Sequence, residues 1–106
     1  MRDLMPSIGF HPEAQTEFAE AINYYLRQGS PRVADSFVFA VESAIEQVLK
    51  SPDRWHVIDE PDIRRYLIRR FPFVLYYRWE SNQDHVTVYA VMHCSREPGY
   101  WKHRVG

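Results

Sequence analysis

Histidine, arginine and tyrosine side chains gather in the last third of this 106-residue chain. His93 ends an apolar run, and Arg96 and Tyr100 follow it closely. A histidine whose pKa lies near neutrality suits proton transfer, and an arginine holds a phosphate or carboxylate through paired hydrogen bonds. RNA cleavage needs such a set: a base for the attacking 2′-hydroxyl, an acid for the leaving oxygen, and cations for the phosphate. His93, Arg96 and Tyr100 are therefore the candidate catalytic residues if the protein cleaves RNA.

Three arginines and a tryptophan form a second candidate set, for binding a phosphate or a target. Arg65, Arg69 and Arg70 fall on a predicted strand, and Trp101 lies in the C-terminal tail. In a regular strand Arg69 and Arg70 point to opposite faces, so one of them joins Arg65 on the open face as an anion clamp. Both sets have a structural alternative. The arginine pair is then a solvated edge, and His93 and the tail aromatics only fix the tail against the sheet.

Several kinds of chemistry find no support in the sequence. No spacing of His, Cys, Asp or Glu resembles a metal site, and no nucleophile elbow or glycine-rich phosphate loop occurs. We therefore expect no metal and no cofactor. Cys94 is the single cysteine, so an intrachain disulfide is impossible, which fits a reducing compartment. The first residues do not resemble a signal peptide and no apolar run has membrane-spanning length, so we expect a cytoplasmic protein without a membrane partner.

Charge is distributed unevenly, although the formal net charge is only −1. Residues 1–62 hold 5 Lys/Arg and 11 Asp/Glu, a net of −6, whereas residues 63–106 hold 8 and 3, a net of +5. Such asymmetry indicates an acidic or polyanionic partner that faces the second half. The alternative is that the two halves neutralise each other within the fold.

Length predicts one domain over residues 1–106, and its first half carries the signals of two helices. His11-Pro12 opens the first helix and Gly29 ends it, whereas Ser30-Pro31 opens a second that runs to Lys50. The link between them is too short for anything but an antiparallel helical hairpin. The second helix has one apolar stripe, formed by Ala34, Phe37, Val38, Val41, Ile45, Val48 and Leu49.

The second half is rich in β-branched and aromatic residues. We expect strands at 63–70, 73–79 and 85–92, with a hairpin turn at 81–84, and a short first strand at 7–10. Strict alternation in the last strand places Val86, Val88, Ala90 and Met92 on one face. The predicted fold is α+β: an N-terminal strand, the helical hairpin and a three-stranded antiparallel sheet, in the order β-αα-βββ. An extended tail with at most a short turn follows.

Four pieces, in this order between residues 10 and 104, resemble the RelE/ParE toxin superfamily. They are Pro12-Glu13-Ala14 with Ala21-Ile22-Asn23-Tyr24-Tyr25; the second helix ending at Ser51-Pro52; Arg69-Arg70-Phe71-Pro72-Phe73-Val74-Leu75-Tyr76-Tyr77; and Val88-Tyr89-Ala90-Val91-Met92-His93 followed by Arg96, Pro98, Tyr100 and Trp101. The resemblance implies the toxin half of a bacterial type II toxin–antitoxin pair, with growth inhibition and plasmid stabilization as its effects.

One branch of this superfamily cleaves mRNA on the ribosome, and another poisons DNA gyrase. The mRNA-cleaving branch usually has an arginine where this chain has Val74, and it carries a lysine pair before the sheet, where residues 51–62 hold only Arg54. Phe71-Pro72-Phe73 and the residues that follow His93 look more like the ParE branch. The resemblance therefore favours a ParE-like, non-enzymatic gyrase inhibitor.

Two further functions stay open: a RelE-like, ribosome-dependent mRNA endonuclease, and a non-toxic scaffold that only binds an antitoxin. A cognate antitoxin is expected in all three cases. We expect an acidic, partly disordered antitoxin segment that folds on this domain and forms a toxin–antitoxin hetero-oligomer. Strand addition or helix-in-groove packing against the helical hairpin and the open face of the sheet is the predicted mode of binding.

Overall fold

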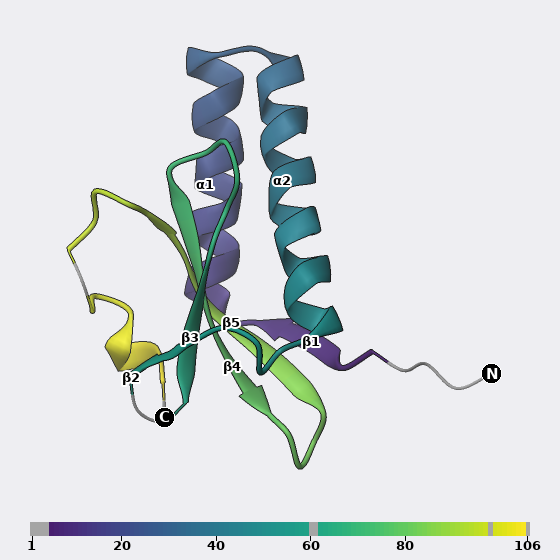
Figure 1. The fold of residues 1–106 in the computed structure, drawn as a ribbon. Coiled ribbons are helices and arrows are strands. Elements are labelled where there is room, and N and C mark those ends of the chain that lie inside the picture. Colours follow the sequence, from purple (N-terminus) through teal and green to yellow (C-terminus); the bar gives the residue numbers. More distant parts are fainter. Residues whose placement is uncertain (1–4, 60–61, 98, 106) are drawn as a thin grey trace.

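A helical hairpin lies against one face of a five-stranded sheet in the part of the chain that the structure, a computed structural model, describes: residues 5–59, 62–97 and 99–105. Figure 1 shows the hairpin extending well beyond the sheet. The elements are β1 (Ser7–Phe10), α1 (Pro12–Gln28), α2 (Pro31–Lys50), β2 (Val57–Asp59), β3 (Ile63–Leu67), β4 (Phe73–Glu80), β5 (His85–His93) and the short 3-10 helix η1 (Lys102–Arg104).

The two helices and their link confirm the predicted antiparallel hairpin (Figure 1). The Ser30 hydroxyl caps α2 by accepting a hydrogen bond from the backbone N–H of Val33 at 3.2 Å. Gly29 fits the link because a Cβ there would lie 2.9 Å from the carbonyl oxygen of Tyr25. Five side chains of α2 are buried: Ala34, Phe37, Val41, Ala44 and Val48. The predicted stripe therefore forms most of the face of α2 that packs on the sheet, except that Ala44 joins it and Val38 is only half-buried.

The sheet is larger than the sequence indicated. Its strand order is β1-β5-β4-β3-β2, with β1 parallel to β5 and the other pairs antiparallel. The predicted three-stranded antiparallel sheet is thus its centre, and two outer strands complete it. The chain between β1 and β5, which contains the helical hairpin and the other three strands, is long enough for the crossover that parallel pairing requires. The sequence does not predict β2 because this strand has three residues and an irregular register with β3, which leaves no alternation to detect.

An irregularity in β5 changes which side chains face the helices. Tyr76 pairs with Ala90 whereas Tyr77 pairs with Val88, so Tyr89 is an extra residue in the ladder. Val86 and Val88 belong to the helix-side core, as does Val91, whereas Ala90 and Met92 belong to the opposite face. The expectation of strict alternation from Val86 to Met92 was therefore wrong beyond Val88.

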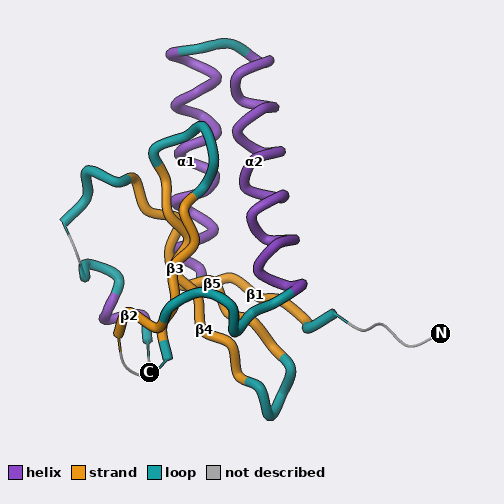
Figure 2. Tube along the Cα trace, viewed as in Figure 1, coloured by secondary structure: helices purple, strands orange, loops and turns teal. Residues whose placement is uncertain are grey.

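The turn between β3 and β4 lies beside the helices (Figure 2), and aromatic side chains pack it against them. The rings of Phe71 and Phe37 meet edge to face at 5.2 Å, and Tyr25 meets Phe71 at the same distance. β3 ends at Leu67, so the predicted strand to residue 70 was too long. Because Arg70 has φ 71°, the backbone turns there and cannot continue a strand.

The other face of the sheet has a smaller core of its own. Val74, Tyr76, Ala90 and Met92 are buried there, and the C-terminal segment covers them. Trp101 stacks on Tyr76 with ring centres 4.9 Å apart. This segment, yellow in Figure 1, lies across the sheet from α2, so the sheet is covered on both faces.

Candidate functional site

A largely buried carboxylate, that of Glu17, organises the C-terminal segment. Both oxygens of Glu17, on α1, accept hydrogen bonds from the guanidinium of Arg104 at 3.0 Å, and the Tyr100 hydroxyl donates a third. The backbone N–H of Val91 donates a fourth at 3.0 Å. The Arg104 side chain is only 4% exposed and that of Glu17 13%, so solvent screens this ion pair weakly.

The end of β1 explains why these side chains meet β5. Pairing between the two strands stops at Phe10 and Val88, and the carbonyl of Val88 accepts the last of these bonds from His11. Beyond that point the carbonyl of Tyr89 accepts a hydrogen bond from Arg104 at 2.9 Å, and Glu17 takes the N–H of Val91. Buried backbone groups need partners, and two charged side chains provide them here in place of a strand.

The electrostatics of the cluster keep Tyr100 protonated. Burial, followed by the hydrogen bond to Glu17 and the negative charge of that carboxylate, raises the pKa of Tyr100 above its ordinary value of 10.0. Burial tends to lower the pKa of Arg104, but the hydrogen bond and the charge of Glu17 outweigh it and raise that pKa, so the guanidinium is charged. At neutral pH Tyr100 is therefore protonated, and its hydroxyl proton is already engaged in the hydrogen bond to Glu17.

Two guanidiniums pack on the ring of Tyr100. The Cζ of Arg96 lies 4.1 Å from the ring centre and that of Arg104 lies 4.8 Å from it. Arg96 is exposed and forms no ion pair within residues 5–59, 62–97 and 99–105. It is thus a solvent-facing cation in a defined position.

Other basic residues of the segment pair with acidic residues from the front half of the chain. His103 lies 3.0 Å from a carboxylate oxygen of Glu13, and Lys102 lies 3.0 Å from one of Asp59. Together with Arg104, they neutralise acidic side chains of residues 1–62 within the fold, so part of the charge asymmetry of the sequence does not reach a partner. The alternative of mutual neutralisation therefore describes the tail well.

The structure separates His93 from Tyr100. The Nδ1 atom of His93 accepts a hydrogen bond from the backbone N–H of Ser95 at 3.0 Å, and its ring meets Phe73 edge to face at 5.2 Å. Phe73 belongs to the helix-side core, whereas Tyr100 packs against the core of the other face. The catalytic set expected for an endonuclease is thus not assembled around one point.

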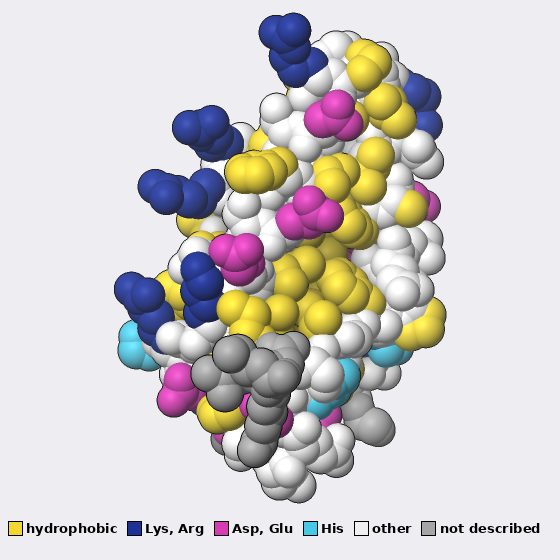
Figure 3. All heavy atoms as spheres, turned by 90° about the vertical axis from the view of Figure 1, so that its right-hand side faces the viewer, with side chains coloured by type: hydrophobic (Ala, Val, Ile, Leu, Met, Phe, Trp, Pro, Cys, Tyr) yellow, Lys and Arg dark blue, Asp and Glu magenta, His cyan; other side chains and the backbone are white. Residues whose placement is uncertain are grey.

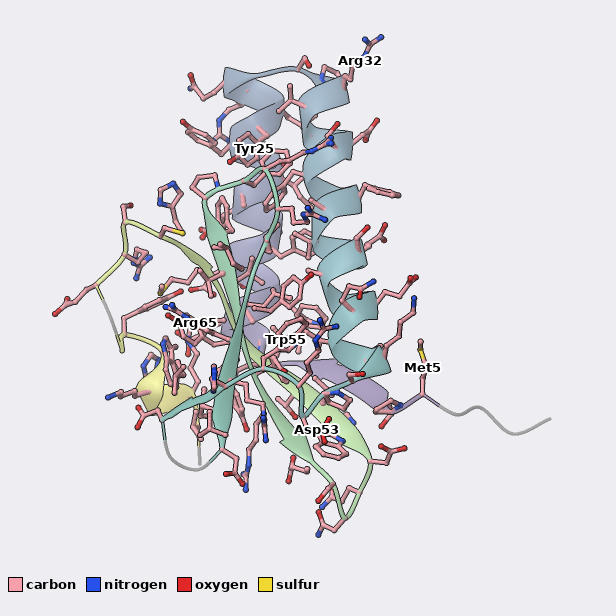
Figure 4. All side chains as sticks on the ribbon, in the orientation of Figure 1. Met5, Tyr25, Arg32, Asp53, Trp55 and Arg65 are labelled. Carbon is pink, nitrogen blue, oxygen red and sulfur yellow. The ribbon has the colours of Figure 1, made fainter. Side chains whose placement is uncertain are left out.

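The target-binding candidates are also dispersed. Arg65 is exposed on β3, on the side of the sheet where the C-terminal segment lies (Figure 4). Arg69 and Arg70 lie in the turn after β3, so the expected pair on opposite faces of a strand does not form. Trp101 is 3% exposed and holds the tail on the sheet. Its ring packs on that of Tyr76.

A groove of about 1290 Å³ runs between α2 and the turn that connects β3 and β4. Two of its lining side chains are unusually exposed for apolar residues, Phe39 at 72% and Leu67 at 65%. Arg69 and Arg70 line it from the turn, and Trp55 lines it between β3 and α2 (Figure 4). In Figure 3 a band of hydrophobic side chains runs down this face of the molecule, with basic side chains gathered along its left border.

Comparison with known proteins identifies the family. Residues 8–98 match the family model described as the ParE toxin of the type II toxin–antitoxin system parDE. The chain belongs to the ParE toxin family. It is a type II toxin of the ParE-like kind, and this membership implies a cognate antitoxin as its partner. No sequence among the curated proteins matches the chain.

Solved structures show that this ParE-family toxin shares the fold of both branches of the superfamily. A chain of the chromosomal ParDE system from P. aeruginosa is similar with a TM-score of 0.72 at 14% identity, covering 84% of this chain and 96% of that one. The isolated E. coli toxin RelE gives 0.60 at 19% identity, with 92% and 94% covered. A free double arginine-to-alanine mutant of E. coli RelE gives 0.60 at 18%, with 87% and 86% covered.

Sequence reasoning missed the two residues that order the tail of this ParE-family toxin. The helical pattern gives Glu17 only a place at the favourable end of the helix dipole, and it gives Arg104 no role. One signal was present: Glu13 and Glu17 share a face of α1 because they are four residues apart, and Lys102-His103-Arg104 is the densest basic run of the tail.

Two kinds of feature are absent from the described residues. No helix there combines the length and the apolar content that a membrane crossing needs. No group of three or more His, Cys, Asp or Glu side chains there is placed to hold a metal ion.

Proposed function

We propose that this ParE-family toxin arrests growth without catalysis, by binding DNA gyrase in the cytoplasm, and that a cognate antitoxin prevents this binding. The observation that carries the proposal is the state of Tyr100. Its hydroxyl donates to Glu17, which forms a part-buried ion pair with Arg104, and its pKa is raised. A tyrosine in this state cannot take the proton of a 2′-hydroxyl at neutral pH.

The dispersal of the other candidate groups supports the same proposal. General acid–base catalysis requires the base and the acid within hydrogen-bond reach of one reacting centre. His93 packs on Phe73 at one face of the sheet, whereas Arg96 packs on Tyr100 at the other. Surface contact with a protein makes no such demand, because exposed arginines and aromatic residues at separate points can share one interface.

The groove suits the antitoxin. Phe39 and Leu67 offer apolar contacts, and Arg69 and Arg70 offer positive charge along the border formed by the turn. The ligand with matching chemistry is an amphipathic helix whose apolar stripe enters the groove and whose acidic side chains face the turn. An antitoxin segment that is disordered alone and folds here would therefore neutralise the toxin by occupying this face.

The function is tested by expressing the chain with and without its antitoxin. Growth arrest with trapped gyrase–DNA cleavage complexes, and inhibition of supercoiling by the purified protein, is the expected result. Cleavage of translated mRNA that is lost on His93→Ala would establish the endonuclease instead. Normal growth without the antitoxin would leave only the scaffold function.

The antitoxin surface is tested by binding measurements on charge-reversal variants. Arg69→Glu with Arg70→Glu is expected to weaken antitoxin binding by about tenfold or more, mainly through slower association that depends on salt. Arg27→Glu is the matched control, because Arg27 is exposed on α1 and does not line the groove. Equal effects of the double variant and the control would place the antitoxin elsewhere.

A further inference from the structure

We propose that Arg96 is a preorganised guanidinium that receives a carboxylate of the toxin's target protein, and that Glu17 positions it through Tyr100. The inference rests on the proposed function in one respect, that the target is a protein. It goes beyond that function by assigning Tyr100 the role of a platform and by naming the chemical group that the tail recognises.

Most cations of the described tail are paired with carboxylates. Lys102, His103 and Arg104 each lie within 3.0 Å of a carboxylate oxygen of Asp59, Glu13 and Glu17, respectively. Arg96 is exposed and has no ion pair within the part of the chain that the structure describes. It is therefore the cation of the described tail that remains available to a ligand.

Arg96 packs on the ring of Tyr100. Its Cζ lies 4.1 Å from the centre of the Tyr100 ring, the geometry of a cation–π contact. Stacking uses the face of the guanidinium and leaves its in-plane N–H groups free, and these are the donors that grip a carboxylate in pairs. Restricting a long side chain in advance lowers the entropy cost of binding.

Three contacts restrain Tyr100. Glu17 accepts its hydroxyl proton, the guanidinium of Arg104 lies 4.8 Å from its ring centre, and its backbone carbonyl is 2.9 Å from the Nδ1 atom of His103. Glu17 itself is held by Arg104 and by the N–H of Val91. The Glu17 carboxylate therefore restrains the Tyr100 ring, and the ring in turn restrains the guanidinium of Arg96.

The charge pattern favours a protein carboxylate over a nucleic acid. Binding to a phosphate backbone gains strength from many unneutralised cations at once. The described tail provides one, and the exposed Glu97 follows it directly in sequence. One oriented guanidinium beside a carboxylate suits recognition of a single acidic side chain.

The test compares variants of the full chain for growth arrest and for binding to purified gyrase. Arg96→Gln and Tyr100→Leu are both expected to weaken binding by about tenfold to a hundredfold. The first removes the charged guanidinium that binds the carboxylate, and the second removes the ring that holds this guanidinium in place. Tyr100→Phe keeps the ring and is expected to cost only about threefold. Arg27→Gln, on the exposed surface of α1, is the control for unchanged activity.

A second readout reports the platform directly. The Nε proton of Arg96 in NMR spectra should carry an upfield ring-current shift in the parent chain. The shift should be smaller in Tyr100→Phe and in Glu17→Gln, because each change weakens the link between the carboxylate and the ring, and absent in Tyr100→Leu. A role of Glu17 confined to stability would leave this resonance unchanged in folded Glu17→Gln, which keeps the ring. Thermal unfolding of each variant shows that it is folded at the temperature of the measurement.

Three outcomes would overturn the inference. Damage from Tyr100→Phe equal to that from Tyr100→Leu would make the phenol proton the essential group. Full activity of Arg96→Gln would remove the guanidinium from recognition. Binding to a fluorescent DNA duplex that depends on Arg96 would replace the carboxylate by a phosphate. If the parent chain itself does not arrest growth, the proposed function fails first, and the role of Arg96 at a target falls with it.

Discussion

The ion pair between Glu17 and Arg104 should contribute more to stability than any exposed pair of this protein. Both side chains are nearly buried, and the pair joins α1 to the last residues described. Removing one partner leaves the other charge desolvated and uncompensated, which typically costs about 3–5 kcal/mol. Because Glu17 retains some exposure, we expect about 3 kcal/mol for Glu17→Gln or Arg104→Met.

A double-mutant cycle measures the interaction itself. Each single variant is expected to lower the unfolding midpoint by about 12 °C or more, since 1 kcal/mol corresponds to about 4–8 °C for a domain of this size. The double variant, with both charges removed, should cost about as much as one single variant. The coupling free energy from urea or thermal unfolding should therefore be about 2–3 kcal/mol.

The chain contains a matched control. Glu46 and Lys50 form an ion pair at 3.3 Å on α2, but their side chains are 61% and 52% exposed. The same cycle on this pair should give about 0.5 kcal/mol or less. Additive effects at Glu17 and Arg104, within about 0.5 kcal/mol, would refute the reasoning, because they would show that the buried pair is no more coupled than a surface pair.

Three further outcomes follow from the packing of the fold. Trp101→Ala should destabilise the protein by about 3–5 kcal/mol in urea unfolding, because it removes the ring that stacks on Tyr76 and leaves a cavity there. Gly29→Ala should cost about 1–2 kcal/mol in the same assay despite a better helix former, because the new Cβ would crowd the carbonyl of Tyr25; an increase in stability would contradict this close approach in the link. Spectrophotometric titration should show Tyr100 ionising later than a free tyrosine. Since its folded pKa is raised, its contribution to stability is complete below pH 10.0 and is lost as the pH rises above that value, so Tyr100→Phe should show a weaker loss of stability in alkali.

Local patterns were sufficient for the helical hairpin and the central strands. The Ser30-Pro31 start and the apolar stripe of α2 depend on neighbours in sequence, and the structure has both where the pattern placed them. The packing of Phe71 and Phe73 against the helices was not predicted, although both residues belong to a piece that carried the family resemblance. Family resemblance came from the same local pieces, and the family match confirms it.

The candidate site was a different matter, because its contacts join residues far apart in the chain. Glu17 and Arg104 meet because β1 stops at Phe10 and the extra residue Tyr89 turns the edge of β5 toward them. Neither the end of β1 nor the bulge at Tyr89 has a local sequence signature, because both depend on how the strands pair in the assembled sheet. Residue types and their spacing were thus enough for the layers and the family, whereas the buried pair, the platform under Arg96 and the distance of His93 from it arose only when the sheet had assembled.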